Sequence, residues 1–282
     1  SLPKKGVRKM SILYTPRGRA REYAPLAVNL YSGCSHGCKY CYVPDIPPWR
    51  FSQSPRKDFH DSVTPRKDVI KKLERDLKNN PGNGERVMLC FTTDPYQDAN
   101  NEHGLTRKTI GLLHQYGYNV QVLTKGGKNA LQDLDMFTKN DAFATTMTLL
   151  SEEDSLKWEP KAALPKERME TVEEFYNAGI PTWISLEPVL NPESSLEIIR
   201  LTHKYTDLFK IGKLNHHKLA DRYDWGDFAI KALELCESLG QAYYMKDDLA
   251  AFLEVPLGVN HITVQEIETS AEKPPELQPA MF

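Results

Sequence analysis

Three cysteines gathered in one short loop constrain this chain more than any other feature of its sequence. Cys34, Cys38 and Cys41 stand at C-x3-C-x2-C spacing, and Gly33 and Gly37 lie beside them. Three thiolates this close can hold three irons of a [4Fe–4S] cluster and leave the fourth iron open. An open iron needs a ligand that the protein does not supply. The spacing therefore predicts an iron–sulfur cluster that binds a second, non-protein group.

Two other uses of these cysteines fit the sequence less well. Disulfide bonds would leave one of the three unpaired, and the N-terminus shows no secretory signal. A structural zinc site needs a fourth ligand, which His36 or His60 could supply, but zinc modules usually pair two C-x2-C arms. The chain has five cysteines, three of them in this loop, which indicates a reducing compartment. We therefore expect a cytoplasmic protein.

Length and composition set the broad class. The 282 residues are 40% hydrophobic and 26% charged, which suits one large domain with a sizeable core. The net charge of -2 gives no global basic field that would indicate nucleic acid, so any such contact needs a local patch. No apolar run approaches the ~20 residues of a membrane span, so we expect no membrane contact.

Short apolar runs alternate with amphipathic helical patterns along the chain. This alternation is typical of βα units and a parallel sheet. It predicts the α/β class, with a partial (β/α)6 TIM-type barrel at 26–255, a basic N-terminal arm at 1–25 and a short, partly disordered C-terminal extension at 256–282. The expected strands lie at 26–31, 87–92, 119–125, 142–149, 181–187 and 208–212.

Polar side chains end several of these expected strands. Asp94, Lys125, Thr146 and Glu187 each follow an apolar run, and the cysteine loop follows the first one. In barrels of parallel strands the chemistry lies at the carboxyl ends of the strands. We therefore expect these side chains around one ligand site, although each alone could be a cap or an ion-pair partner.

The cysteine motif, with an aromatic residue just before its last cysteine, resembles the radical S-adenosylmethionine (SAM) signature. The segment Thr93–Gln97, with sequence TDPYQ, and the run Leu123–Lys125 extend the likeness. Over roughly residues 20 to 215 the chain resembles the spore photoproduct lyase-like branch of that superfamily, also described as DNA-repair-photolyase-like. The resemblance implies two cofactors, a [4Fe–4S] cluster and SAM, whose reductive cleavage gives a 5′-deoxyadenosyl radical that abstracts hydrogen from the substrate.

The same resemblance implies roles for individual residues. Cys34, Cys38 and Cys41 match the cluster ligands, and Tyr40 matches the aromatic residue that faces the adenine. Lys125 matches a lysine that pairs with the SAM carboxylate, because a cation at a strand end suits an anionic ligand. Two further cofactor contacts are expected at Thr146, near the ribose, and at Asp94, which could instead form a turn with Pro95.

The chain departs from true spore photoproduct lyases at the position of their hydrogen donor. Those enzymes carry a cysteine two residues before the aspartate, where this chain has Thr92, whose O–H bond is too strong for that work. Cys90, two residues earlier on the same strand face, is a displaced donor candidate or a buried packing residue. Tyr42 matches a tyrosine that relays hydrogen. Glu187 is an acid that many relatives lack, and it could bind a ligand or transfer a proton.

The substrate class is predicted from one loop. The loop from Val43 to Val63 carries Trp49, Arg50 and Phe51, and aromatic residues among cations can stack bases and hold phosphates. We therefore expect a nucleic acid or other nucleobase-containing substrate, with a flavodoxin- or ferredoxin-type reductant as partner. Two alternatives stay open: radical SAM modification of a peptide, protein or small metabolite, and a non-catalytic iron–sulfur sensor.

Overall fold

The computed structural model describes residues 12–215, 217–263 and 266. The remaining parts of the predicted arm and C-terminal extension lie outside the described residues. The core is one parallel sheet of seven strands in the order β1-β4-β5-β6-β7-β8-β9. These strands are Leu26–Val28 (β1), Arg86–Leu89 (β4), Asn119–Thr124 (β5), Ala142–Thr146 (β6), Thr182–Leu186 (β7), Leu208–Ile211 (β8) and Tyr243–Met245 (β9).

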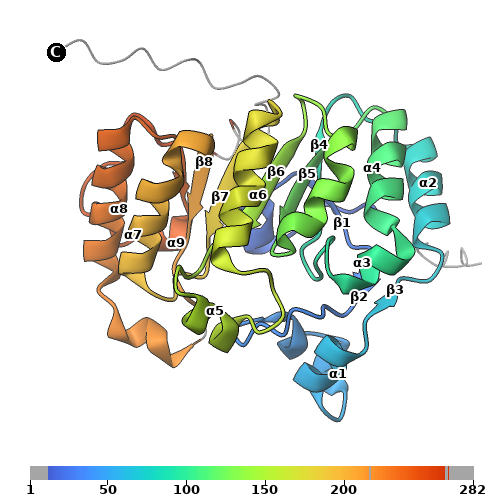
Figure 1. Ribbon diagram of the computed structural model, residues 1–282, viewed down its shortest axis with the longest axis horizontal. Helices are drawn as coiled ribbons and strands as arrows, with labels where there is room; N and C mark the ends of the chain where they lie inside the picture. The colour runs from blue at the N-terminus through green and yellow to red at the C-terminus, as the bar shows by residue number, and fades with distance from the viewer. Residues whose placement is uncertain (1–11, 216, 264–265, 267–282) are drawn as a thin grey trace, which may run out of the picture.

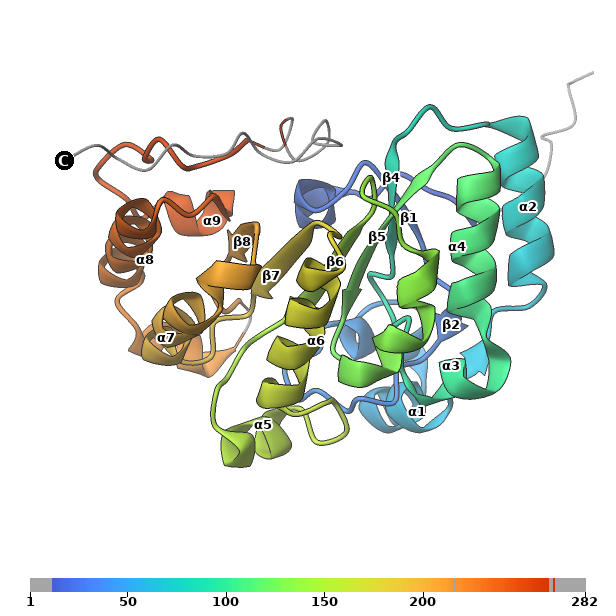
Figure 2. The ribbon, with the colours of Figure 1, turned by 45° about the horizontal axis from the view of Figure 1, so that its top comes forward.

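Helices cover the outer face of this sheet as an arc (Figures 1 and 2). The covering helices are α2 (Val69–Asn79), α4 (Leu105–Gln115), α6 (Pro165–Asn177), α7 (Pro192–Thr202) and α8 (Trp225–Leu239). Shorter elements are α1 (Pro55–Asp61), α3 (Asp98–His103), α5 (Glu152–Trp158), α9 (Asp247–Ala250) and the two-stranded sheet of β2 (Tyr31–Ser32) and β3 (Thr64–Pro65). The 3-10 helices are η1 (Gly18–Glu22), η2 (Val43–Asp45), η3 (Trp49–Phe51), η4 (Gly127–Met136), η5 (His203–Tyr205) and η6 (Lys218–Arg222).

The fold class predicted from the sequence is confirmed, because every expected strand has its counterpart in a parallel α/β sheet. Two details differ. β9 was not predicted, since three residues without a clear apolar pattern give too weak a signal. The segment between the third and fourth expected strands forms the 3-10 helix η4 in place of an α-helix. The paired strands run in parallel register, for example Val87 with Val120 and Ile184 with Phe209.

The N-terminal segment crosses the concave face of the sheet between its two edge strands. Tyr14 pairs with Ala27 of β1 through two backbone hydrogen bonds. The Tyr23 carbonyl accepts hydrogen bonds from Gln121 of β5 and Lys210 of β8. The Tyr23 ring packs against Trp183 inside the barrel, with 5.7 Å between the ring centroids. This part of the predicted basic arm therefore fills the open side of the partial barrel.

Candidate functional site

A cavity of about 510 Å³ opens at the carboxyl edge of the sheet. In Figure 1 this is the lower edge, where the loops leading to α1, α3 and α5 leave the strands. Eight of the ten side chains predicted for the site line this cavity: Cys34, Tyr40, Tyr42, Cys90, Asp94, Lys125, Thr146 and Glu187. The other two, Cys38 and Cys41, belong to the loop that also carries Cys34. Parallel strands place their carboxyl ends at one edge, which explains why residues so distant in sequence meet.

The cysteine loop is held in a fixed path by its glycines. Gly33 has φ +89°, and a Cβ there would lie 2.7 Å from the Phe59 carbonyl oxygen. The backbone N–H of Cys34 donates to that same carbonyl at 3.2 Å, and His60 Nδ1 lies 2.8 Å from the Cys34 carbonyl. Larger residues at Gly33 would push the loop off α1. Glycine therefore fits this position for a steric reason.

The three thiols suit an iron–sulfur cluster as a set of donors. None of the three cysteines is in a disulfide, and Cys34 faces the cavity. Within the described ranges, no three His, Cys, Asp or Glu side chains gather around the position of one metal ion. Cluster ligands need no such common point, because each thiolate binds a different iron. Three free thiols on one loop at the mouth of a cavity fit the predicted cluster.

A buried ion pair ties the cysteine loop to the strand ends. Glu159 and Arg168 lie 2.5 Å apart, and each side chain is only 1% exposed. The Tyr40 hydroxyl donates to Glu159, and so does the Thr148 hydroxyl at 3.0 Å. Arg168 also donates to the carbonyl of Thr146 at 2.9 Å. The pair therefore connects the cysteine loop with the end of β6.

Glu159 and Arg168 were not predicted from the sequence, because neither ends a strand nor belongs to a motif. Backbone bonds from the same segment reinforce their link. Lys39 N–H donates to the Trp158 carbonyl, Lys161 N–H to the His36 carbonyl, and Ala163 N–H to the Lys125 carbonyl. The segment 158–163 is thus bonded to the cysteine loop on one side and to the end of β5 on the other.

Lys125 brings a cation to the cavity without an anionic partner. Its ammonium makes no ion pair within 4.0 Å among the described residues, although it lines the cavity beside Cys34. Burial acts to lower the pKa of Lys125, but interactions with the acidic groups of Cys38, Glu159 and Asp94 outweigh burial and raise that pKa above its ordinary value. The side chain is therefore a charged donor available to an anionic ligand.

Asp94 holds the backbone around Lys125 in place. Its carboxylate accepts hydrogen bonds from the Lys125 N–H at 2.8 Å, the Thr124 hydroxyl at 2.6 Å and the Tyr96 N–H at 2.9 Å. The bond to Tyr96, two residues on, is the turn that the sequence allowed as an alternative. Through these bonds Asp94 links the end of β4 to the end of β5. They also hold the backbone of Lys125, from which its side chain extends.

Cys90 and Tyr42, the two residues considered for hydrogen transfer, both line the cavity. Burial raises the pKa of the Cys90 thiol to about 12, so it keeps its hydrogen at neutral pH. Thr92 lines the same cavity. Tyr42 is 53% exposed at its rim, and burial of the hydroxyl, together with the Cys41 charge, raises its pKa to about 12. Cys90 is therefore both a packing residue and a wall residue of the cavity.

Glu187 belongs to a cluster that the sequence did not reveal. Both of its carboxylate oxygens accept from the Lys246 ammonium, at 3.0 and 2.8 Å, and one also accepts from the Tyr23 hydroxyl at 2.5 Å. A Cβ at Gly212 would lie 2.8 Å from Lys246 and 3.0 Å from Glu187, so only glycine leaves room for the pair. Lys246 and Tyr23 were missed because one follows the unpredicted strand β9 and the other lies in the arm.

The aromatic residues of the Trp49 loop lie in two different environments. Trp49 packs edge-on against Phe59, with 5.3 Å between ring centroids, and is absent from the cavity lining. Phe51 is 73% exposed, and the Arg50 guanidinium lies 4.8 Å from its ring centre. Trp49 is therefore an anchor of the loop, as expected for an indole beside a buried phenylalanine.

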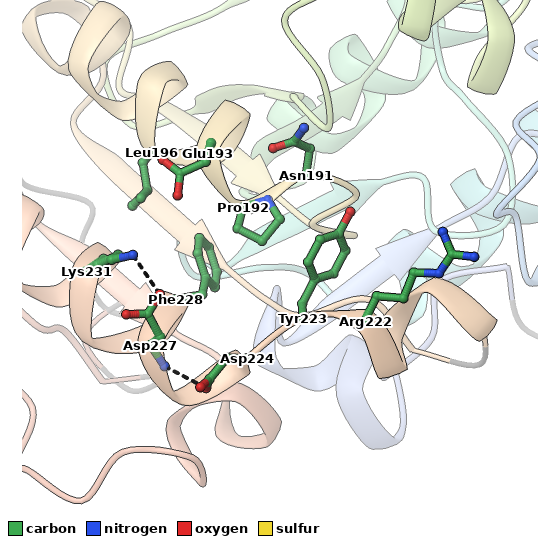
Figure 3. A pocket seen from close by; sticks show the side chains of 10 residues that line it. All are labelled: Asn191, Pro192, Glu193, Leu196, Arg222, Tyr223, Asp224, Asp227, Phe228 and Lys231. Atoms are coloured by element: carbon green, nitrogen blue, oxygen red, sulfur yellow. Dashed lines mark hydrogen bonds and ion pairs between the residues drawn. The ribbon is translucent and has the colours of Figure 1, made fainter.

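A second pocket, of about 230 Å³, lies where α7 and α8 begin (Figure 3). Three of its charged groups interact within α8 or at its start. Asp224 accepts from the backbone N–H of Asp227, and the Lys231 ammonium lies 2.7 Å from the Asp227 carboxylate. None of the predicted site residues lines it. The candidate site is therefore the larger cavity at the strand ends.

Two uncharacterised proteins are similar in sequence to parts of this chain. An uncharacterised protein of Mycobacterium tuberculosis (strain H37Rv) is 35% identical over 99 residues, which cover 35% of this chain and only 29% of that protein. An uncharacterised protein of Methanocaldococcus jannaschii is 24% identical over 195 residues, 68% of this chain and 71% of that protein.

Solved structures share the fold. Spore photoproduct lyase complexed with dinucleoside spore photoproduct superposes with a TM-score of 0.62 at 15% identity, covering 86% of this chain and 80% of that one. Streptococcus suis SuiB bound to S-adenosylmethionine gives 0.55 at 11% identity, covering 80% and 51%. In the part of the chain that the structure describes, no helix is long and apolar enough to cross a membrane. The model of the radical SAM superfamily matches residues 28–204, so the chain belongs to this superfamily.

Proposed function

We propose that this chain cleaves SAM reductively at a [4Fe–4S] cluster held by Cys34, Cys38 and Cys41, and that it acts on a nucleobase-containing substrate. The observation that carries the proposal is Lys125, a cation that lines the same cavity as Cys34 and makes no ion pair within the part of the chain that the structure describes. When bound, the cluster and SAM supply a 5′-deoxyadenosyl radical that abstracts hydrogen from the substrate. The protein binds and orients SAM and the substrate, and it keeps solvent away from the radical.

The residues around the cavity divide this work. Lys125 pairs with the SAM carboxylate, because a charge-assisted bond suits a buried cation and an anionic ligand. Tyr40, held by Glu159, packs against the adenine, and Thr146 contacts the ribose. Glu187, fixed by Lys246 and Tyr23, faces the substrate. An external one-electron donor of the flavodoxin or ferredoxin class reduces the cluster.

The substrate class rests on the structural neighbours and on the lining of the cavity. A neighbour with a TM-score of 0.62 was solved with a dinucleoside photoproduct, and the cavity here carries aromatic and cationic side chains. Thr92 cannot return a hydrogen atom. If the product must regain one, Cys90 is the donor, because its thiol is neutral and lines the cavity.

The proposed function is tested by reduction of the reconstituted protein with dithionite in the presence of SAM. We expect slow release of 5′-deoxyadenosine and methionine, which becomes faster when an oligodeoxynucleotide substrate is added. With a deuterated substrate, the label should appear in 5′-deoxyadenosine. A protein that keeps its cluster and binds SAM but releases no 5′-deoxyadenosine would instead be a sensor.

Replacement of Lys125 tests the SAM site separately. We expect Lys125→Met to weaken SAM binding by ~1.5–3 kcal/mol, since a hydrogen bond to a charged group is lost. Calorimetric titration of SAM into the reconstituted protein measures this change. Lys128→Met is the matched control, because the Lys128 ammonium is exposed and pairs with Glu170 at 2.8 Å. Equal SAM affinity in the two variants would remove Lys125 from the site.

A further inference from the structure

The two ends of the cavity differ in chemistry. One end is formed by the cysteine loop and by the ends of β4 to β6, where the proposed function places the cluster and SAM. The other end is formed by the N-terminal segment and by the residues that follow β8 and β9. Four cations line this second end: Arg17, Arg19, Lys213 and Lys246.

A chain of polar contacts organises this second end. Arg19 lies 3.0 Å from the carboxylate of Asp248. The Asn215 amide donates to the same Asp248 oxygen at 2.9 Å and accepts from the Lys213 ammonium at 2.9 Å. Arg19 and Lys213 are therefore held on either side of Asn215 and Asp248, although they come from opposite ends of the sequence.

Among the residues that line this end, cations outnumber carboxylates. Lys246 pairs with Glu187, and Arg19 pairs with Asp248. For Arg17 and Lys213, in contrast, no carboxylate partner is found among the described residues, and Lys213 bonds only to a neutral amide. Two cations that make no ion pair among the described residues thus line one end of the cavity. Like charges grouped in a cleft focus the field and attract an anion.

The N-terminal segment is preorganised for such contact. Tyr23 fixes it to the inner face of the sheet through its bonds to Gln121, Lys210 and Glu187. Glu22 also accepts from the Tyr244 hydroxyl of β9 at 2.9 Å. Arg17 and Arg19 are carried by this anchored segment, so their backbone needs little ordering when a ligand binds. Preorganisation of this kind lowers the cost of binding.

We propose that the end of the cavity between the N-terminal segment and the loops after β8 and β9 is a phosphate subsite, formed by Arg17, Lys213 and Arg19. It holds a phosphate group of the substrate while the base lies toward the cysteine loop. Phosphate suits this set because an arginine fork binds two oxygens and a lysine adds a point charge. This inference rests on the proposed function, since it assigns part of the substrate to that same cavity.

Two probes that differ only in charge test the subsite. Thymidylyl-thymidine carries one phosphodiester, and its methylphosphonate analogue is neutral. Both are titrated calorimetrically into the reconstituted full chain with SAM. We expect the wild type to bind the charged probe at least about tenfold more tightly than the neutral one. This ratio of affinities corresponds to the free energy of one charge-assisted hydrogen bond. Arg17→Met and Lys213→Met should each remove most of that preference.

Lys204→Met is the matched control, because this exposed lysine precedes β8 and so lies at the opposite edge of the sheet. It should keep the wild-type preference. Thymidine 5′-monophosphate, tested beside the dinucleotide, distinguishes a terminal phosphate from a backbone phosphodiester. The subsite is overturned if the wild type binds the charged and neutral probes equally, binds neither, or keeps its preference in both cavity variants.

The same samples separate this inference from the proposed function. Release of 5′-deoxyadenosine without any probe, measured in the wild type and in Lys204→Met, reports SAM cleavage apart from probe binding. If the wild type releases none, the proposed function fails while the ratio of probe affinities is still measured. Since Arg17 is exposed, its replacement leaves the fold intact and keeps this readout interpretable.

Discussion

Replacement of Cys38 by alanine should abolish the iron–sulfur cluster and with it all SAM cleavage. Anaerobically reconstituted wild type should bind about four irons and four sulfides per chain, as one cluster requires. The variant should retain almost none, because two remaining thiolates cannot hold the cluster firmly. Iron and sulfide analysis, visible absorption and 5′-deoxyadenosine release measure the loss together.

Cys236→Ala is the control for this experiment. Cys236 is a fully buried free cysteine of α8, far along the chain from the cysteine loop. Its replacement removes a thiol and leaves a small core gap, but it should leave iron content unchanged. A full cluster in Cys38→Ala, or an equal loss in Cys236→Ala, would show that the assignment of the three ligands is wrong.

Much of the fold and part of the site could be predicted from the sequence for a physical reason. Buried parallel strands read as short apolar runs, so the strands from β4 to β8 were found with small errors at their ends. The polar residues that end those strands, Asp94, Lys125, Thr146 and Glu187, then had to lie at one edge. The structure places all four around one cavity.

The residues that were missed act through contacts distant in sequence. Glu159 looks like any surface acid in a helical pattern, yet it is 1% exposed and bonded to Tyr40, Thr148 and Arg168. Tyr23 lies among arginines and glycine in a segment that looked like a solvated arm. Such residues have no local pattern, because their role depends on which elements fold against them.

The Trp49 loop shows that one local composition fits two different structures. An aromatic residue beside cations is typical of a surface that stacks bases, but the same composition also fits a loop anchored by its largest side chain. The structure shows the second case, with Trp49 against Phe59. Local composition could not distinguish the two, because the difference lies in whether a buried ring is available underneath.

Replacement of Arg168 by methionine should give the largest loss of stability, because it leaves the Glu159 carboxylate buried without its cation. Breaking a buried ion pair by removal of one partner typically costs ~3–5 kcal/mol. Arg168 also donates to the carbonyls of Thr146 and Ala163. Because the variant loses both bonds, the backbone at these two residues is no longer held in place. Urea denaturation of the variant and wild type measures the change in the free energy of unfolding.

The double variant Glu159→Gln, Arg168→Met identifies the cause. If the uncompensated carboxylate dominates, neutralising it should restore part of the lost stability, because no buried charge is then left alone. The exposed pair of Arg200 and Glu197, 3.1 Å apart and about half exposed on each side, is the control. Arg200→Met should change stability by no more than ~1 kcal/mol, as is usual for surface pairs.

Because Tyr40 donates to Glu159, SAM binding should also weaken in Arg168→Met, whereas Arg200→Met should bind SAM like the wild type. An Arg168→Met protein with wild-type stability and SAM affinity would show that the pair does not hold the cysteine loop against the strand ends.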